Sequence, residues 1–66
     1  MVSDPDIFRA AKLLIDQHGE EALLRAAERA DLLLEDGDTE GAAIWRRILA
    51  AIEELMRGRR EGEAVN

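Results

Sequence analysis

The organisation of the chain is clearest in residues 22–39, which read ALLRAAERADLLLEDGDT. Apolar residues recur every three or four positions as far as Leu34, which is the spacing of one face of an α-helix. Gly37 follows, and a glycine just past a helix end adopts the left-handed conformation at little cost. Asp38 and Thr39 are residue types that cap the start of a helix. The stretch therefore predicts a helix, a tight turn and the beginning of a second helix.

Gly19 and Gly58 predict two further helix ends in the same way, and Ser3 or Asp4 predicts the first helix start, with Pro5 in the first turn. The expected helices cover residues 5–18, 20–35 and 39–57. Short connections favour antiparallel neighbours. We therefore predict an all-α fold over residues 1–57, either as a compact three-helix bundle or as a helical hairpin pair completed by dimerisation. The polar, aperiodic residues 58–66 predict a disordered tail.

The size of the chain favours association. It has 66 residues and no cysteine, so neither a disulfide nor a thiolate metal site can stabilise it. A single core of this size rarely supplies more than about 3–5 kcal/mol. Leucines at positions 13, 24 and 32 fall outside the main apolar arcs of their helices. We expect a second buried face, and hence a self-associating protein or one that binds a partner.

The expected interface combines these leucines with the apolar face of the last helix. Trp45 is the best anchor, because large amphipathic rings dominate the binding energy of many interfaces. The candidate interface residues are Leu13, Leu24, Leu32, Trp45, Ile48, Ile52 and Leu55.

The charge of the chain excludes some partners and suggests another. It carries 15 acidic and 9 basic residues, a net charge of −6, which argues against nucleic acid or an anionic membrane as the main ligand. Acidic residues gather between positions 28 and 40, where Arg29 is the only base. The alternative function is therefore an acidic decoy or inhibitor that binds a basic, nucleic-acid-binding protein. Its candidate residues are Glu28, Asp31, Glu35, Asp36, Asp38 and Glu40.

The sequence predicts no catalytic, cofactor-binding or metal-ligating residues. His18, the one histidine, has no nearby group to orient it, and we expect a partly buried ring that favours the negative end of the first helix. Residues 36–41 begin like a calcium loop, but its twelfth position would be Arg47, where a bidentate glutamate is required. We therefore expect no enzyme and no cofactor.

The N-terminal residues 1–6 are acidic and lack the apolar segment of a signal peptide, and the longest apolar run is far shorter than a membrane span. We expect a cytoplasmic protein that binds no membrane.

Three stretches together resemble a family of short, uncharacterised helical proteins of alphaproteobacteria. They are IFRAAKLLIDQHG at residues 7–19, the pattern AAxxADxLL at residues 26–34, and WRRIxxAIEEL at residues 45–55. The resemblance covers residues 5–57. It implies a small cytoplasmic helical protein with no assigned activity, and it transfers no functional residue to this chain.

Overall fold

The computed structural model describes the backbone of residues 3–65 and the side chains of residues 3–58. Helix α1 covers Asp4–His18, a short 3-10 helix η1 covers Gly19–Glu21, helix α2 covers Ala22–Glu35, and helix α3 covers Thr39–Val65. All regular secondary structure in this range is helical, so the predicted all-α class is confirmed.

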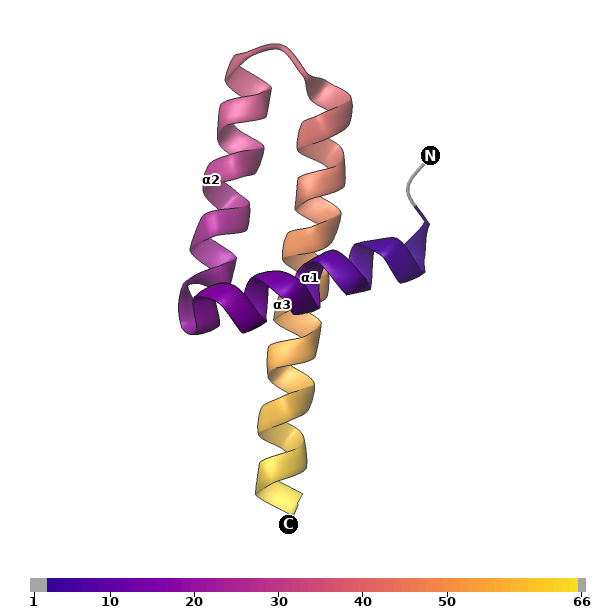
Figure 1. The fold of residues 1–66 in the computed structure, drawn as a ribbon, viewed down its shortest axis with the longest axis vertical. Coiled ribbons are helices and arrows are strands. Elements are labelled where there is room, and N and C mark those ends of the chain that lie inside the picture. Colours follow the sequence, from indigo (N-terminus) through magenta and orange to yellow (C-terminus); the bar gives the residue numbers. More distant parts are fainter. Residues whose placement is uncertain (1–2, 66) are drawn as a thin grey trace.

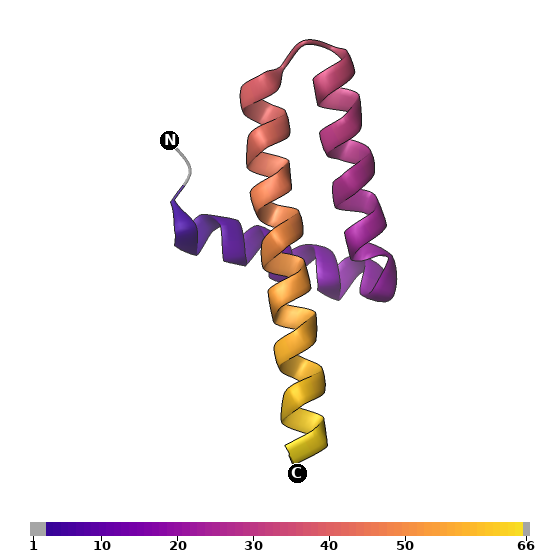
Figure 2. The same ribbon diagram turned by 180° about the vertical axis from the view of Figure 1, so that it is seen from behind.

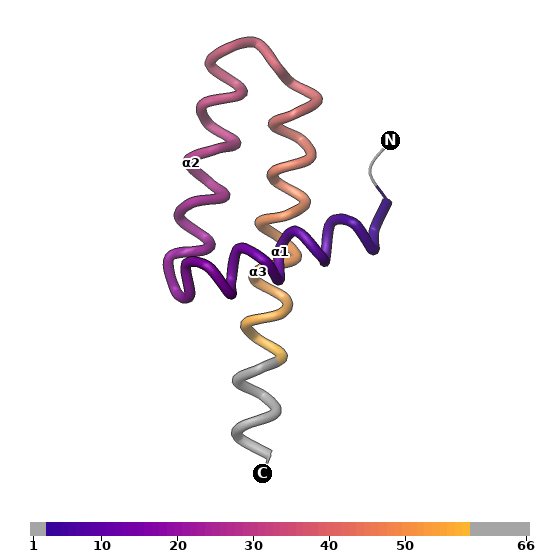
Figure 3. The backbone as a smooth tube through the Cα atoms, in the orientation of Figure 1, coloured from indigo at the N-terminus to yellow at the C-terminus, as the bar shows by residue number. Residues whose placement is uncertain are grey.

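Helices α2 and α3 form an antiparallel hairpin, and α1 lies across one end of it (Figures 1 and 2). The backbone trace shows that α1 passes over α3 near the N-terminal end of α2 and leaves the other end of the hairpin uncovered (Figure 3). The predicted compact bundle of three helices is therefore not confirmed. The short connections predict antiparallel packing of consecutive helices, which α2 and α3 show, whereas α1 runs across its neighbours rather than alongside them (Figures 1 and 2).

The junction between α1 and α2 contains the 3-10 turn that redirects the chain. Gly19 has a positive φ of 59°, but its ψ of −128° lies outside the left-handed helical region predicted for a glycine at a helix end. Its N–H donates to the carbonyl of Ile15. Glu20 and Glu21 belong to η1, so α2 begins at Ala22 rather than at the predicted residue 20. The sequence did not reveal this turn, because acidic residues are equally suited to the first turn of an α-helix.

The turn between α2 and α3 follows the prediction closely. Gly37 has a φ of 86°, and its N–H donates to the Leu34 carbonyl at 3.0 Å, while the Asp38 N–H donates to the Leu33 carbonyl at 2.9 Å. These are the two hydrogen bonds of a Schellman motif. Asp38 then caps α3, since its Oδ1 accepts a hydrogen bond from the Gly41 N–H at 2.9 Å.

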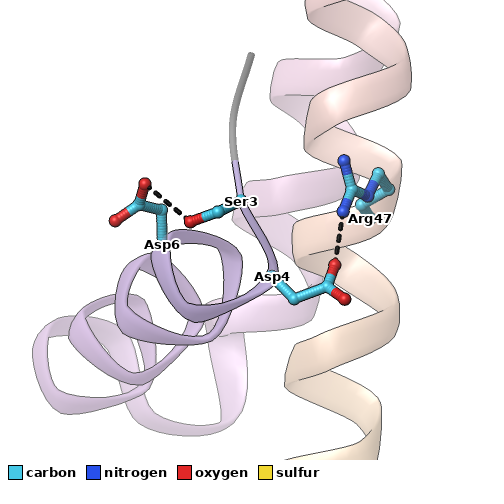
Figure 4. A network of polar contacts seen from close by, with 4 residues as sticks. All are labelled: Ser3, Asp4, Asp6 and Arg47. Carbon is cyan, nitrogen blue, oxygen red and sulfur yellow. Dashed lines mark hydrogen bonds and ion pairs between the residues drawn. The ribbon is translucent and has the colours of Figure 1, made fainter.

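The start of α1 is held by local and distant polar contacts (Figure 4). Ser3 is the N-cap residue and has an extended backbone conformation, but its hydroxyl donates to Asp6 Oδ2 at 3.0 Å rather than capping a backbone group. Arg47 Nη2 on α3 donates to Asp4 Oδ1 at 2.6 Å. The ion pair fixes the beginning of α1 to the middle of α3.

Helix α3 runs to Val65, so the helix end predicted at residue 57, with Gly58 as its cap, is wrong. Within the described backbone, positive φ values occur only at Gly19 and Gly37. An isolated glycine inside a helix lowers the stability of the helix but does not end it, and Gly58 is such an internal residue rather than a helix cap. The expected disorder of residues 58–66 concerns behaviour in solution and stays a prediction.

The core consists of small and β-branched residues. Its ten buried apolar residues are six alanines and four isoleucines: Ile7, Ala11, Ile15, Ala22, Ala26, Ala30, Ala42, Ile48, Ala51 and Ile52. The alanines at positions 22, 26 and 30 form a narrow buried stripe on α2, and side chains this small let a neighbouring helix approach closely. The chain's nine leucines all lie in the described part, and none of them is buried.

Candidate functional site

The predicted interface residues separate into exposed, half-buried and buried groups. Leu13, Leu24 and Leu32 have exposed fractions of 56%, 57% and 55%, so their predicted position outside the core is confirmed. Ile48 and Ile52 are 5% and 0% exposed. These two isoleucines belong to the chain's own core, which corrects their assignment to an interface, because no partner can reach them in the folded monomer.

Trp45 and Leu55 are half-buried and pack against the edge of the core. Each therefore contributes to the fold and still presents part of its side chain to solvent. Trp45 is the only tryptophan of the chain, so its fluorescence reports on this position alone.

Two large apolar residues are more exposed than the helical pattern predicts. Leu34 is 45% exposed and Phe8 is 38% exposed, although both were placed on the apolar arcs of their helices. Leu34 lies in the last turn of α2, at the end of the hairpin that α1 does not cover. Phe8 lies near the start of α1, beside a shallow groove that Arg47 and Ala50 of α3 also line. Periodicity identifies which face is apolar, but it cannot show how far a neighbouring helix extends over that face.

An exposed and mostly acidic surface lies on the side of α2 that faces away from the core, and we call it the α2 outer face. It comprises Leu24, Glu28, Leu32 and Glu35, with Arg25 and Asp31 at its edges and Glu21 of η1 beside its N-terminal end, and all of these residues are exposed. At 100° per residue, its four central residues fall within about 80°, opposite the buried alanine stripe of α2, and Glu28 lies midway between the two leucines.

The ion pairs on α2 lie on this same face. Arg25 is within 3.7 Å of Glu21 and within 3.8 Å of Glu28, and both pairs have the spacing of neighbouring turns. The side chains are more than half exposed, so each pair contributes little to the stability of the fold. Their main effect is to place the one cation of the outer face between two of its carboxylates.

The six residues of the predicted acidic cluster are all exposed, but they do not form one uniform surface. Three of them lie on α2, at positions 28, 31 and 35, and Asp36 is the C-cap residue that follows this helix. Asp38 uses a carboxylate oxygen to cap α3. Only the α2 members share a helix with the exposed leucines, and sequence alone did not separate them from the turn residues.

His18 lies in the last turn of α1, as predicted, but its side chain is exposed rather than partly buried.

An open groove lies between the 3-10 turn and the middle of α3. It is lined by Glu20, Leu23, Glu53, Met56 and Arg57. The described residues bring together no group of three histidine, cysteine, aspartate or glutamate side chains that could hold a metal ion. None of the described helices is long and apolar enough to cross a membrane.

Comparison of the chain with protein-family models, curated proteins and solved structures gives no match. The surfaces of the molecule itself are therefore the guide to its function. The resemblance to the alphaproteobacterial proteins stays a prediction.

Proposed function

We propose that this protein is a small, non-enzymatic helical interaction module that associates with a second copy of itself. One observation carries the proposal: none of the nine leucines, which are the most numerous large apolar residues of the chain, is buried. A core of alanine and isoleucine leaves much of the chain's apolar surface in contact with water, and burying such surface is the main driving force of association.

The self-association surface we propose is the end of the hairpin that α1 leaves uncovered (Figure 1). Over residues 30–42, the buried residues are Ala30 and Ala42 alone. The larger apolar side chains near this end of the hairpin are not fully buried, since Leu33, Ile44 and Trp45 are half-buried and Leu34 is exposed. We call Leu33, Leu34, Ile44 and Trp45 the distal apolar surface.

A second hairpin packed on this surface would complete the core that α1 provides at the other end. Full burial of a leucine side chain is worth about 1.5–3 kcal/mol relative to an exposed one. In a symmetric dimer each side chain contributes twice, so a few partly exposed residues can offset the cost of association.

The experiment is sedimentation equilibrium of the full chain over a range of concentrations, in low and in high salt. We expect a mass that rises from 7.4 kDa towards a multiple of it, with an association that salt does not weaken. The emission of Trp45 should shift to shorter wavelength in parallel, because its ring leaves water.

Leu34→Ser should weaken this association, whereas Leu13→Ser should not. The two leucines have comparable exposure, but Leu13 lies on α1, away from the distal apolar surface. A monomer at every concentration and salt would contradict the proposal, as would an equal effect of the two substitutions.

We propose the acidic decoy as a second candidate function, supported by the exposure of all six acidic residues between positions 28 and 40. In this case the protein occupies a basic, nucleic-acid-binding surface of a partner protein. Such a complex should weaken steeply as ionic strength rises, whereas an apolar self-interface should persist. The salt dependence, measured for self-association and for a complex with a basic partner protein, therefore separates the two functions.

A further inference from the structure

We infer that α1 exchanges between two copies of this protein, with Gly19 as the hinge. In the closed form described above, α1 packs on α3 of its own chain. In the exchanged form α1, η1 and α2 become one continuous helix of residues 4–35, and α1 packs on α3 of the second copy. This inference goes beyond the proposed self-association, because it uses the contact between α1 and α3 and none of the residues of the distal apolar surface.

The break between α1 and α2 depends on the backbone of one residue. His18, Glu21 and Ala22 lie in the right-handed helical region, and Glu20 belongs to the 3-10 turn. Gly19 departs from this conformation, with a φ of 59° and a ψ of −128°. Rotation of the Gly19 backbone into the helical region would therefore join the three helical segments into one.

The buried faces of α1 and α2 would lie on the same side of such a helix. Each of the two helices buries residues at four-residue spacing, namely Ile7, Ala11 and Ile15 on α1 and Ala22, Ala26 and Ala30 on α2. At 100° per residue, the buried positions of both helices fall within an arc of about 140° of one uninterrupted helix. Gly19 is the only glycine between residues 4 and 35, so the rest of this segment has no glycine to oppose a continuous helix.

A chain with this continuous helix cannot cover α1 with its own α3. Leu23, near the start of α2, lines one groove with Met56, so a straightened α1 would lie beside the residues that follow Met56. Their sequence is RGRREGEAVN, which is mostly charged and offers little apolar surface. The apolar face of α1 and the α3 surface that it covers in the closed form would both be left in water, at a high cost in free energy.

A second copy supplies the missing half of each contact. The closed form shows that the two surfaces fit, because the buried residues of α1 share one core cluster with Ile48, Ala51 and Ile52 of α3, and Arg47 pairs with Asp4 at 2.6 Å. Since α1 crosses α3 in the closed form (Figure 1), two straightened hairpins would cross each other in the same way, and one two-fold axis satisfies both contacts. The occupant of the vacated α3 surface is therefore α1 of the second chain.

The test changes the residue at position 19 in chains that also carry Leu34→Ser, which weakens the distal apolar surface. A Cβ at Gly19 would meet no atom within 4 Å, so Gly19→Ala acts on the backbone conformation alone. L-alanine is strained at a φ of 59° and favours the continuous helix, and both chains of a dimer gain from the change. We expect the dimerisation constant, measured by sedimentation equilibrium, to rise about a hundredfold or more.

Replacement of Gly19 by D-alanine, introduced by chemical synthesis of the chain, is the matched control. It adds the same methyl group with the opposite handedness, and a D-residue prefers a positive φ. The D-alanine protein should therefore keep the closed form and remain a monomer of 7.4 kDa.

A mixing experiment shows whether α1 is the exchanged element. One population of Gly19→Ala, Leu34→Ser chains carries 15N, and the other carries a nitroxide spin label at Lys12→Cys, an exposed position of α1 in a chain without other cysteines. In the mixed dimer the label should broaden the amide signals of residues 48–52 on α3 of the 15N chain. The helix content measured by circular dichroism should not decrease.

A monomeric Gly19→Ala, Leu34→Ser protein, folded or unfolded, would overturn the inference. Equal dimerisation of the L-alanine and D-alanine proteins would also overturn it, as would a dimer in which the spin label leaves residues 48–52 unaffected. Leu34→Ser alone, in the chain that keeps Gly19, tests the proposed function separately. If that substitution does not weaken association, the distal interface is contradicted, while the pair of position-19 proteins still decides whether α1 exchanges.

Discussion

Arg47 on α3 donates a hydrogen bond to Asp4 Oδ1 at 2.6 Å, across 43 positions of sequence (Figure 4). Among the described side chains this is the one ion pair that connects two helices, since the pairs of Arg25 are local. It fixes the first turn of α1 against α3 at the point where α1 begins to cross the hairpin.

We expect this ion pair to orient α1 on α3 while contributing little to the free energy of unfolding. The side chains of Arg47 and Asp4 are 47% and 81% exposed, and exposed ion pairs contribute about 0.2–1 kcal/mol. A double-mutant cycle with Asp4→Asn and Arg47→Gln, measured by urea unfolding, should therefore give a coupling energy in that range that decreases with added salt. A coupling well above it, or one that salt does not change, would contradict the exposed geometry.

Ile52 should be the residue most sensitive to truncation. It is fully buried and is the largest side chain with so little exposure. Ile52→Val should cost about 0.5–1.5 kcal/mol and Ile52→Ala about 2–5 kcal/mol. Because a core of this size supplies about 3–5 kcal/mol in total, the alanine variant should be largely unfolded by circular dichroism at room temperature. Leu32→Ala, at an exposed position, should leave the melting curve nearly unchanged.

Substitutions of Asp38 and Gly41, at the start of α3, should have coupled effects on the free energy of unfolding. Asp38→Ala removes the hydrogen bond to the Gly41 N–H and should cost about 1 kcal/mol, whereas Asp38→Asn should keep most of the cap. A Cβ at position 41 would lie 2.5 Å from Asp38 Oδ2, so Gly41→Ala must displace the capping side chain.

The coupling follows from two opposing contributions of Gly41→Ala. In the natural chain the loss of the cap offsets the gain in helix propensity, so the change in unfolding free energy should be small. In the Asp38→Ala background only the gain remains, about 1 kcal/mol. Equal effects of Gly41→Ala in the two backgrounds, measured by chemical denaturation, would show that the cap and the glycine act independently.

Gly37 should be intolerant of alanine for a different reason. A Cβ at this position would meet no atom within 4 Å, but the φ of 86° is a conformation that side-chain-bearing residues rarely adopt. Gly37→Ala should therefore destabilise the protein by about 1–2 kcal/mol. Gly37→Asn should cost less, because asparagine tolerates the left-handed region better. Thermal unfolding of the two variants gives the comparison, and equal melting temperatures would contradict a backbone origin.

The sequence predicts local features of this protein better than its packing. The helix end at Gly37 and the helix cap at Asp38 each depend on neighbouring residues, and both predictions are confirmed. The crossing of α1 depends on a 3-10 turn at Gly19–Glu21 and on contacts such as Asp4 with Arg47, which lie far apart in the chain. Helical periodicity contains no information on either.

The candidate surfaces show the same difference between local features, which the sequence predicts, and helix packing, which it does not. Periodicity identified Leu13, Leu24 and Leu32 as lying outside the core, because their angular positions follow from the helix alone. It assigned Ile48 and Ile52 to an interface, because an apolar face does not reveal whether its partner is a helix of the same chain. It missed the exposure of Leu34, which results from the limited length of α1 across the hairpin.

The last prediction concerns Gly58, which lies inside α3 rather than at its end. A Cβ at this position would meet no atom within 4 Å, and its φ is not positive, so alanine fits the helical conformation without strain. Gly58→Ala should therefore favour the helix beyond residue 58 by up to about 1 kcal/mol. Since a terminal helical segment is marginal without tertiary contacts, this difference should raise its population measurably.

The measurement is the Cα chemical shift of residues 59–65 in the two proteins, together with far-ultraviolet circular dichroism. Helical secondary shifts should increase in the alanine variant, while the urea midpoint of the core stays constant. Gly58→Pro is the opposing control, because proline removes a hydrogen bond and clashes with the preceding turn. Random-coil shifts of residues 59–65 in all three proteins would contradict this prediction, since the substitutions would then have no helix beyond residue 58 to act on.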